Sequence, residues 1–319
     1  MSGNAPARTA DQADLARMLD AVIDGAAVLP SDERPEEVAA LRSQLAELGV
    51  WTLGVPEHLG GGGADATLTA TAFARLGRRW AALGWAAVQA HVAAGLLGDH
   101  PALRARIHAG EIGIAVTTGQ RVDAAAEAPH VIVLGDTGAR WYEPGSLRYR
   151  PVRHTGLDGA LTRVVEFDGE GIALDGAVPA ATTRLRLGAA AVAAGIADGA
   201  AETALDYSRA RKQFGGPLTA LPTVRDALLS SSGPAAVLLR QALHGADATP
   251  WQAAAVLDAA CEAAVDAAAR AVQSHGGYGY LTEYPAERSL RDAVSLRAAC
   301  DTAAVRRDGA LDLAGSAKG

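Results

Sequence analysis

The sequence predicts an α+β fold in three parts: an N-terminal helical domain (residues 1–110), a small, reduced middle β domain (111–180) and a C-terminal four-helix bundle (181–319). Apolar residues recur at helical spacing up to about residue 110 and again from about 181, whereas between these stretches the pattern alternates with period two. A hydrophobic content of 49% with only 4% aromatic residues predicts a core of Ala, Leu and Val, which suits close helix–helix packing.

The first part of the chain has the spacing of five helices, at 10–28, 35–48, 67–79, 84–97 and 101–109. Four consecutive glycines, Gly60 to Gly63, precede the third helix. We interpret them as a connection into a helix capped by Asp65 rather than as a phosphate cradle, because no Gly-Lys-Ser/Thr follows. His91 lies in an apolar helix with no other ligand type at metal spacing, so we expect a satisfied core histidine.

The middle part contains short alternating runs separated by Gly, Asp and Pro. Strands are expected at 112–117, 130–134, 139–143, 147–152 and 162–167. Glu166, Asp168 and Glu170 form an acidic cluster at the end of the last run. We interpret this cluster as a solvated hairpin end and expect no metal there.

The last part has the pattern of a helical bundle. Long helical runs are expected at 181–213, 223–244, 251–274 and 284–313, the last as one helix or two. Short connections between them favour antiparallel neighbours.

Composition excludes several classes of function. The formal net charge of −7 argues against nucleic acid as a partner. Cys261 and Cys300 are the only cysteines, which gives no disulfide framework and favours a reducing cytoplasm. The first ten residues lack an apolar core of signal-peptide length, and no run is long and apolar enough to span a bilayer. We therefore expect a cytoplasmic protein without a membrane partner.

Two segments in the C-terminal half carry the functional information. Gln-Ser-His-Gly-Gly-Tyr-Gly-Tyr at 273–280 ends a helical run and is followed by Arg291-Asp292-Ala293. Glycines there allow a tight turn and close approach of a ligand, although a helix–turn–helix corner is the commoner explanation of such a segment alone. The other segment is Tyr-Ser-Arg-Ala-Arg-Lys-Gln-Phe-Gly-Gly-Pro-Leu at 207–218. Together they resemble the C-terminal half of the acyl-CoA dehydrogenases, flavoenzymes that desaturate acyl-CoA thioesters.

The resemblance is close from residue 182 to the end and weak from 119 to 160. It implies contacts with FAD bound mainly by a neighbouring subunit, with Arg211 and Gln213 at the pyrophosphate and a Gln-x-x-Gly-Gly turn at the adenosine half. The cofactor-binding residues implied in this way are Arg211, Gln213, Phe214, Gln273, Gly276 and Gly277. Arg186 matches a family arginine near the substrate thioester, although the acidic residue three positions earlier is Thr183 here.

The resemblance also shows what this chain lacks. The family's catalytic glutamate falls on Cys300, and the position of the minority base falls on Leu185. Cys300 is expected to be a small buried hydrophobe, and Asp301 is one residue out of register and one methylene shorter. The segments that hold the flavin ring are also missing, since Val116–Arg121 departs from Thr-Glu-Pro and Trp141 lacks a following Thr-Asn.

The resemblance therefore implies a subunit without its own base that shares FAD with a full-length acyl-CoA dehydrogenase, where the acyl-CoA is mainly bound. The chain resembles the short subunit of the α2β2 acyl-CoA dehydrogenases of actinobacterial steroid degradation. The steroid class of the substrate follows from this resemblance alone. Two alternatives stay open: a homotetrameric acyl-CoA dehydrogenase with a relocated base, for which Asp301 is the candidate, and an assembly protein that binds no flavin.

Overall fold

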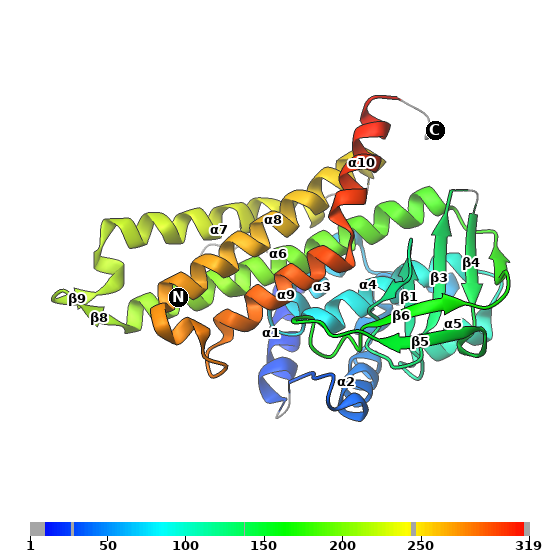
Figure 1. Ribbon diagram of the computed structural model, residues 1–319, viewed down its shortest axis with the longest axis horizontal. Helices are drawn as coiled ribbons and strands as arrows, with labels where there is room; N and C mark the ends of the chain where they lie inside the picture. Colours follow the sequence, from blue (N-terminus) through cyan, green and yellow to red (C-terminus); the bar gives the residue numbers. More distant parts are fainter. Residues whose placement is uncertain (1–9, 27–28, 137, 244–246, 316–319) are drawn as a thin grey trace.

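The computed structural model describes residues 10–26, 29–136, 138–243 and 247–315. The molecule is elongated, with a long helical bundle along its length and the strands of its middle part at one end (Figure 1). The predicted order of helices, strands and a second set of helices is confirmed. None of the helices in the described ranges is long and apolar enough to cross a membrane.

Five α-helices precede the strands in the described part of the chain, as predicted. They are α1 (Ala10–Gly25), α2 (Pro35–Glu47), α3 (Ala66–Arg79), α4 (Ala81–Leu96) and α5 (Pro101–His108). The glycine run leads into α3, where the Leu68 N–H donates to Asp65 Oδ1 over 2.7 Å, so the predicted cap is confirmed. His91 is a satisfied core histidine, because Nδ1 hydrogen-bonds to the Ala87 carbonyl at 2.7 Å and Nε2 accepts from the Gly54 N–H at 3.2 Å.

The strands form two small sheets that pack together. One sheet has the order β1-β3-β4-β7, with β1 (Ile114–Thr117), β3 (His130–Gly135), β4 (Gly138–Tyr142) and β7 (Ile172–Leu174); β1 and β3 are parallel and the other pairs are antiparallel. The other has the order β2-β6-β5, with β2 (Arg121–Val122), β6 (Arg163–Phe167) and β5 (Leu147–Pro151). The sequence missed β2 and β7, which are too short to show alternation.

The acidic cluster lies on the surface of the second sheet. Glu166 on β6 stands between two arginines of the neighbouring strand β5, 3.4 Å from Arg148 Nε and 3.5 Å from Arg150 Nε. Asp168 and Glu170 are exposed beyond the end of the strand.

The bundle is built around one 33-residue helix, α6 (Val178–Ala210). Around it lie α7 (Pro222–Leu243), α8 (Pro250–His275) and α9 (Pro285–Ala299), followed by α10 (Thr302–Leu313). Glycines let α6 approach α3 backbone to backbone: a Cβ on Gly195 would lie 2.0 Å from the Ala74 carbonyl oxygen, and one on Gly77 would lie 2.3 Å from that of Val192. No larger residue fits at either position without separating the helices.

The end of α6 differs from the prediction. Helix α6 ends at Ala210 rather than at Gln213, because the chain becomes extended at Arg211 and then pairs β8 (Lys212–Gln213) with β9 (Gly216–Pro217). Phe214, at φ +54°, and Gly215, at φ +85°, make the turn between them. The predicted end of the next helix, His244, lies outside the described residues.

The stretch at 284–313 is two helices. The break falls at Asp301, whose backbone is left-handed at φ +43° and whose Oδ1 accepts from the Ala304 N–H at 3.2 Å to cap α10.

The loop between β5 and β6 is hydrogen-bonded to the segment before α2 and to helix α9. Asp32 accepts hydrogen bonds from the N–H groups of Gly159 (2.8 Å) and Leu161 (3.1 Å) and lies 2.6 Å from His154 Nε2. In the same loop, the Leu157 N–H donates to Asp292 Oδ1 of α9 over 2.7 Å. The loop before β6 is therefore fixed on two sides.

Candidate functional site

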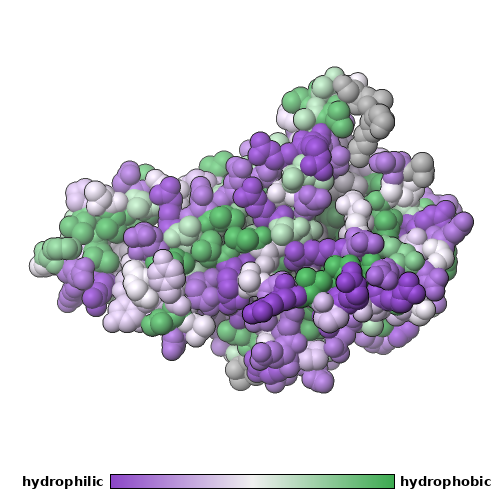
Figure 2. All heavy atoms as spheres, viewed as in Figure 1, coloured by the Kyte–Doolittle hydropathy of each residue, from purple (hydrophilic) through white to green (hydrophobic). Residues whose placement is uncertain are grey.

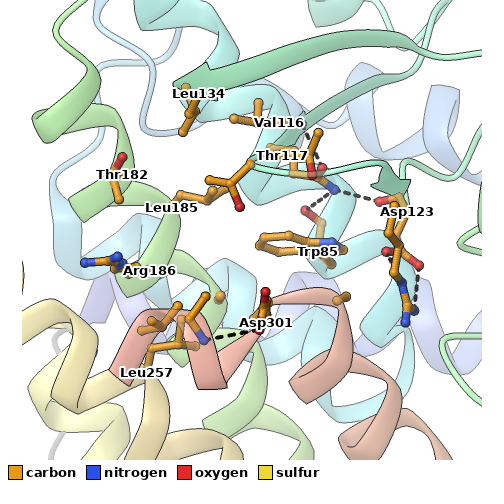
Figure 3. Close-up of a pocket in the computed structure, with 18 of the residues that line it drawn as sticks. Trp85, Val116, Thr117, Asp123, Leu134, Thr182, Leu185, Arg186, Leu257 and Asp301 are labelled. Carbon is orange, nitrogen blue, oxygen red and sulfur yellow. Dashed lines mark hydrogen bonds and ion pairs between the residues drawn. The ribbon is translucent and has the colours of Figure 1, made fainter. Parts of the chain in front are cut away.

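A small pocket of about 80 Å³ lies near the N-terminal end of α6, enclosed by α4, the β1–β2 segment and the junction of α9 and α10. The structure brings together four positions that the sequence had singled out here, Leu185, Arg186, Cys300 and Asp301. Leu185 and Arg186 project from α6 and Asp301 comes from the opposite wall (Figure 3). We call this space the α6 N-terminal pocket.

An ion pair that the sequence analysis missed occupies one wall of this pocket. Asp123 is 3% exposed, and its Oδ2 and Oδ1 accept from Arg121 Nε and Nη2 at 2.8 and 2.9 Å. Thr162 Oγ1 also donates to Asp123 Oδ1 over 2.6 Å, and Gln89 Nε2 donates to the Asp123 carbonyl over 2.6 Å. The two charged residues are i and i+2 on an extended segment, which places them on one face. That spacing was the available signal, but it falls where the family resemblance is weakest.

Arg186 also has a partner within the chain. The residue is 8% exposed, and Nη2 donates to Asp308 Oδ2 over 3.0 Å. Burial lowers the pKa of Arg186, and the negative charge of Asp308 opposes that shift. The guanidinium is therefore held in place by α10.

Leu185 and Cys300, the two positions expected to hold the catalytic base, carry no carboxylate. The nearby carboxylates already have hydrogen-bond partners within the chain. A hydrogen bond with Cys261 and burial raise the pKa of the Cys300 thiol well above its usual range, so it stays protonated. Asp301 caps α10, while Asp123 and Asp308 are paired with arginines. Each of these three carboxylates accepts a hydrogen bond from the chain and two are paired with an arginine, and none of them stands at a family base position.

The residues expected to contact FAD lie at the other end of α6. Arg211, Gln213 and Phe214 are exposed on the β8–β9 hairpin, and Phe214 is 86% exposed. At the adjacent end of α8, Gly276 has φ +59°, and a Cβ on Gly276 or Gly277 would meet no atom within 4 Å. These glycines therefore leave an open backbone surface.

Aromatic stacking joins the two FAD-contact segments. The rings of Tyr207 on α6 and His275 on α8 are stacked with their centroids 4.1 Å apart, and Tyr284 packs edge-on against both. Both segments consequently lie at one end of the bundle (Figure 1). Apolar side chains gather on the surface there (Figure 2), and Phe214 on the hairpin and Leu229 on α7 are exposed. We call the β8–β9 hairpin and the adjacent end of α8 the α6 C-terminal surface. Its aromatic cluster of Tyr207, His275 and Tyr284 was not predicted from the sequence.

The length of α6 separates the two regions. From Arg186 to Arg211 the chain runs through helix almost throughout. At a rise of 1.5 Å per residue this corresponds to roughly 37 Å. A flavin that touches Arg211 therefore does not reach the α6 N-terminal pocket of the same chain.

Family models match both helical parts of the chain. The model of the acyl-CoA dehydrogenase N-terminal domain matches residues 10–100, and that of the acyl-CoA dehydrogenase C-terminal domain matches residues 177–308.

Curated relatives match over a shorter range. An acyl-CoA dehydrogenase of Bacillus subtilis (strain 168) is 41% identical over 114 residues, which cover 34% of this chain and 30% of the relative. The short-chain specific mitochondrial acyl-CoA dehydrogenase of Homo sapiens is 37% identical over 122 residues, covering 34% and 28%. The match thus spans about a third of the length of these relatives.

Solved structures share the fold over nearly the whole chain. The butyryl-CoA dehydrogenase of Megasphaera elsdenii aligns with a TM-score of 0.76 at 21% identity, covering 98% of this chain and 100% of the other. The ChsE4-ChsE5 complex of Mycobacterium tuberculosis aligns with a TM-score of 0.78 at 21% identity, covering 98% and 99%.

Proposed function

Because the chain belongs to the acyl-CoA dehydrogenase family, we propose that it is one subunit of a heteromeric, FAD-dependent acyl-CoA dehydrogenase. A full-length partner carries the base, the flavin ring and most of the acyl-CoA. This chain contributes the α6 C-terminal surface to the partner's cofactor. The observation that carries the proposal is the difference between the two ends of α6. Ion pairs within the chain line the N-terminal pocket, whereas the C-terminal surface is exposed.

The α6 N-terminal pocket does not fit a flavin ring. Ligand pockets for molecules of that size measure roughly 300–1,000 Å³, whereas this one measures about 80 Å³. The Arg121–Asp123 pair lies where the β segment meets the pocket. Enlarging the space would break a buried pair and leave Asp123 without its cation.

The α6 C-terminal surface does fit part of FAD. The planar guanidinium of Arg211 can hold phosphate oxygens two at a time, and the Gln273 amide with the open backbone at Gly276 and Gly277 can receive the adenosine half. When bound, FAD would supply the hydride acceptor that formation of the α,β double bond requires. This chain's residues bind and orient the distal half of the cofactor, and the proton is taken by the partner's base.

The α2β2 assembly and the steroid-derived substrate are the finer parts of the proposal. They are supported by the sequence resemblance to the short subunits of steroid-degrading acyl-CoA dehydrogenases. A fold shared with one component of a two-chain complex is compatible with that assembly. A homotetramer with Asp301 as its base is less favoured, because that carboxylate caps α10.

Purification of the chain alone and together with a full-length partner tests the proposal, with flavin absorbance and dye reduction by acyl-CoA as readouts. We expect the isolated chain to be colourless or insoluble, and the complex to be yellow and active. A yellow, stable homotetramer with stoichiometric FAD would overturn the heteromer. A well-assembled complex whose flavin content does not depend on this chain would support the flavin-free assembly protein instead.

A further inference from the structure

A second and larger cavity, of about 790 Å³, lies on the opposite face of α6 from the N-terminal pocket. Helices α3 and α4, the first turns of α6 and the residues at the start of α8 enclose it. Leu185 and Arg186 face the first pocket, whereas the flanking positions Arg184 and Leu187 face the second. Positions on opposite faces of one helix cannot serve one compact ligand, so this cavity is a separate space.

Most of the side chains that line this cavity are apolar, and the exposed His58 and the hydroxyls of Thr69 and Thr183 also line it. Phe73, Val88 and Val92 line it together with Leu187. His91 also lines it, but both of its ring nitrogens are used by backbone groups. Burial lowers the pKa of His91 to about 4, so its ring is neutral at pH 7. A hydrocarbon body would therefore meet a neutral ring at His91 and apolar side chains beside it.

A single guanidinium stands at the rim. Arg184 is exposed and its Nη2 lies over Gly95, where a Cβ would be 3.0 Å away, so the glycine makes room for it. Within the described residues Arg184 has neither a hydrogen-bond nor an ion-pair partner, in contrast to Arg186 with Asp308. Its position beside an apolar cavity leaves its fork of donors available to an anion.

We propose that this cavity binds an amphipathic carboxylic acid. The aliphatic or alicyclic body packs against Phe73, Val88 and Leu187, and the carboxylate pairs with Arg184. The volume lies within the usual range for small-molecule sites of roughly 300–1,000 Å³. A free acid fits better than its CoA thioester, because only the acid places a charge directly on its hydrocarbon. The proposal uses neither flavin nor the partner's base and stands independently of the proposed function.

Isothermal titration of the full chain, in the complex with which it purifies, tests this site with decanoate and with decan-1-ol as the neutral match. Wild type should bind one decanoate per chain. Arg184→Gln should weaken decanoate binding roughly 10- to 100-fold and leave decanol unchanged. Arg209→Gln, an exposed arginine at the far end of α6, is the charge control and should change neither.

A blocking variant checks the location. Thr183→Trp introduces a bulky ring into the cavity wall and should abolish binding of both probes. Where it fails to fold, Ala180→Trp at the exposed mouth replaces it. Absence of saturable decanoate binding to wild type, or equal decanoate affinity in wild type and Arg184→Gln, would overturn the site. The flavin content of each sample, read in parallel, keeps this result separate from that of the proposed function.

Discussion

The two ends of helix α6 satisfy their charged side chains in different ways. At the N-terminal end Arg186 is buried and paired with Asp308, and Arg121 holds the buried Asp123 in the wall opposite. At the C-terminal end Arg211 and Gln213 are exposed, and within the described part of the chain their side chains have no hydrogen-bond partner. A charged side chain that is paired within the chain is unavailable to a ligand. One that is exposed beside exposed aromatic residues can bind another molecule.

The largest expected effect comes from Arg211→Ala at the open end. Loss of a charge-assisted, bidentate contact should weaken FAD binding to the complex roughly 30- to 1000-fold. FAD occupancy by absorbance on gel-filtered complex measures it, with assembly checked on the same column. Arg209→Ala, two residues earlier and ion-paired with Asp206, is the matched control and should keep full occupancy.

Graded variants sharpen this result. Arg211→Lys should restore binding only in part, since an ammonium lacks the planar fork. Gln273→Ala should weaken FAD binding in the same direction but less, because it removes a neutral hydrogen bond. Normal assembly with unchanged FAD affinity in Arg211→Ala would make Arg211 a surface cation and end the shared-site interpretation.

At the closed end, Asp123→Ala should act on stability instead. It leaves Arg121 and Thr162 without their acceptor and should lower the free energy of unfolding by about 2–3 kcal/mol, since the Arg121 side chain is 30% exposed and can recover some hydration. Chemical denaturation of the complex measures the change. Asp168→Ala, an exposed carboxylate in the same part of the chain, should be nearly neutral. Loss of FAD in Asp123→Ala without loss of stability would contradict the interpretation that Asp123 stabilises the fold and does not take part in FAD binding.

A smaller, pH-dependent effect is expected from the loop before β6. Hydrogen bonding to Asp32 raises the pKa of His154, so its contribution is complete below about pH 6.5 and is lost as pH rises through its higher folded pKa. Burial alone would raise the pKa of Asp32, but hydrogen bonds from His154, Leu161 and Gly159 lower it overall. The Asp32 contribution is therefore present above about pH 3.9 and is lost as pH falls through its lower folded pKa.

The unfolding free energy should thus be highest between about pH 4 and 6.5 and should fall by on the order of 1 kcal/mol above that window. Melting curves of wild type and His154→Gln across this range measure the difference, which should vanish at high pH. FAD affinity should show no such dependence, because this loop lies away from the α6 C-terminal surface. If the stability of wild type and of His154→Gln depended on pH in the same way, His154 would not be the cause of the pH dependence.

The smallest effect is expected at Cys300. Cys300→Ala in the complex should leave the rate within a few-fold of wild type, because a protonated thiol beside Cys261 takes no part in proton abstraction. Asp301→Asn keeps the cap of α10 and should behave likewise. A loss of roughly 10³-fold or more in either variant, as expected for a catalytic acid or base, would place the base in this chain.

The sequence predicted the long, strongly periodic elements well, since their hydrophobic spacing is local information. It placed α3 behind its Asp65 cap and identified the satisfied core role of His91. It extended α6 three residues too far because Arg-Lys-Gln continues a helical composition, while the strain at Phe214 becomes visible only once β8 pairs with β9.

The site was harder to predict because its closure depends on contacts between distant segments. Asp123 is bound by Arg121, Thr162 and Gln89, and only the first of these lies nearby in the sequence. The arginine at position 186 could be aligned with the family, but its partner Asp308 lies 122 positions away. The residues proposed for FAD contact were found from their motifs, and their role stays a prediction.

The close contact between α3 and α6 has a consequence for how the length of the chain can change. Gly195 and Gly77 fix the axial position and the rotation of α6 against α3. An insertion or deletion of one residue between Gly195 and Arg211 would turn the end of the helix by about 100° and aim Arg211 at a different neighbour. The stretch between these two residues should therefore accept substitutions on its exposed face far more readily than any change in its number of residues.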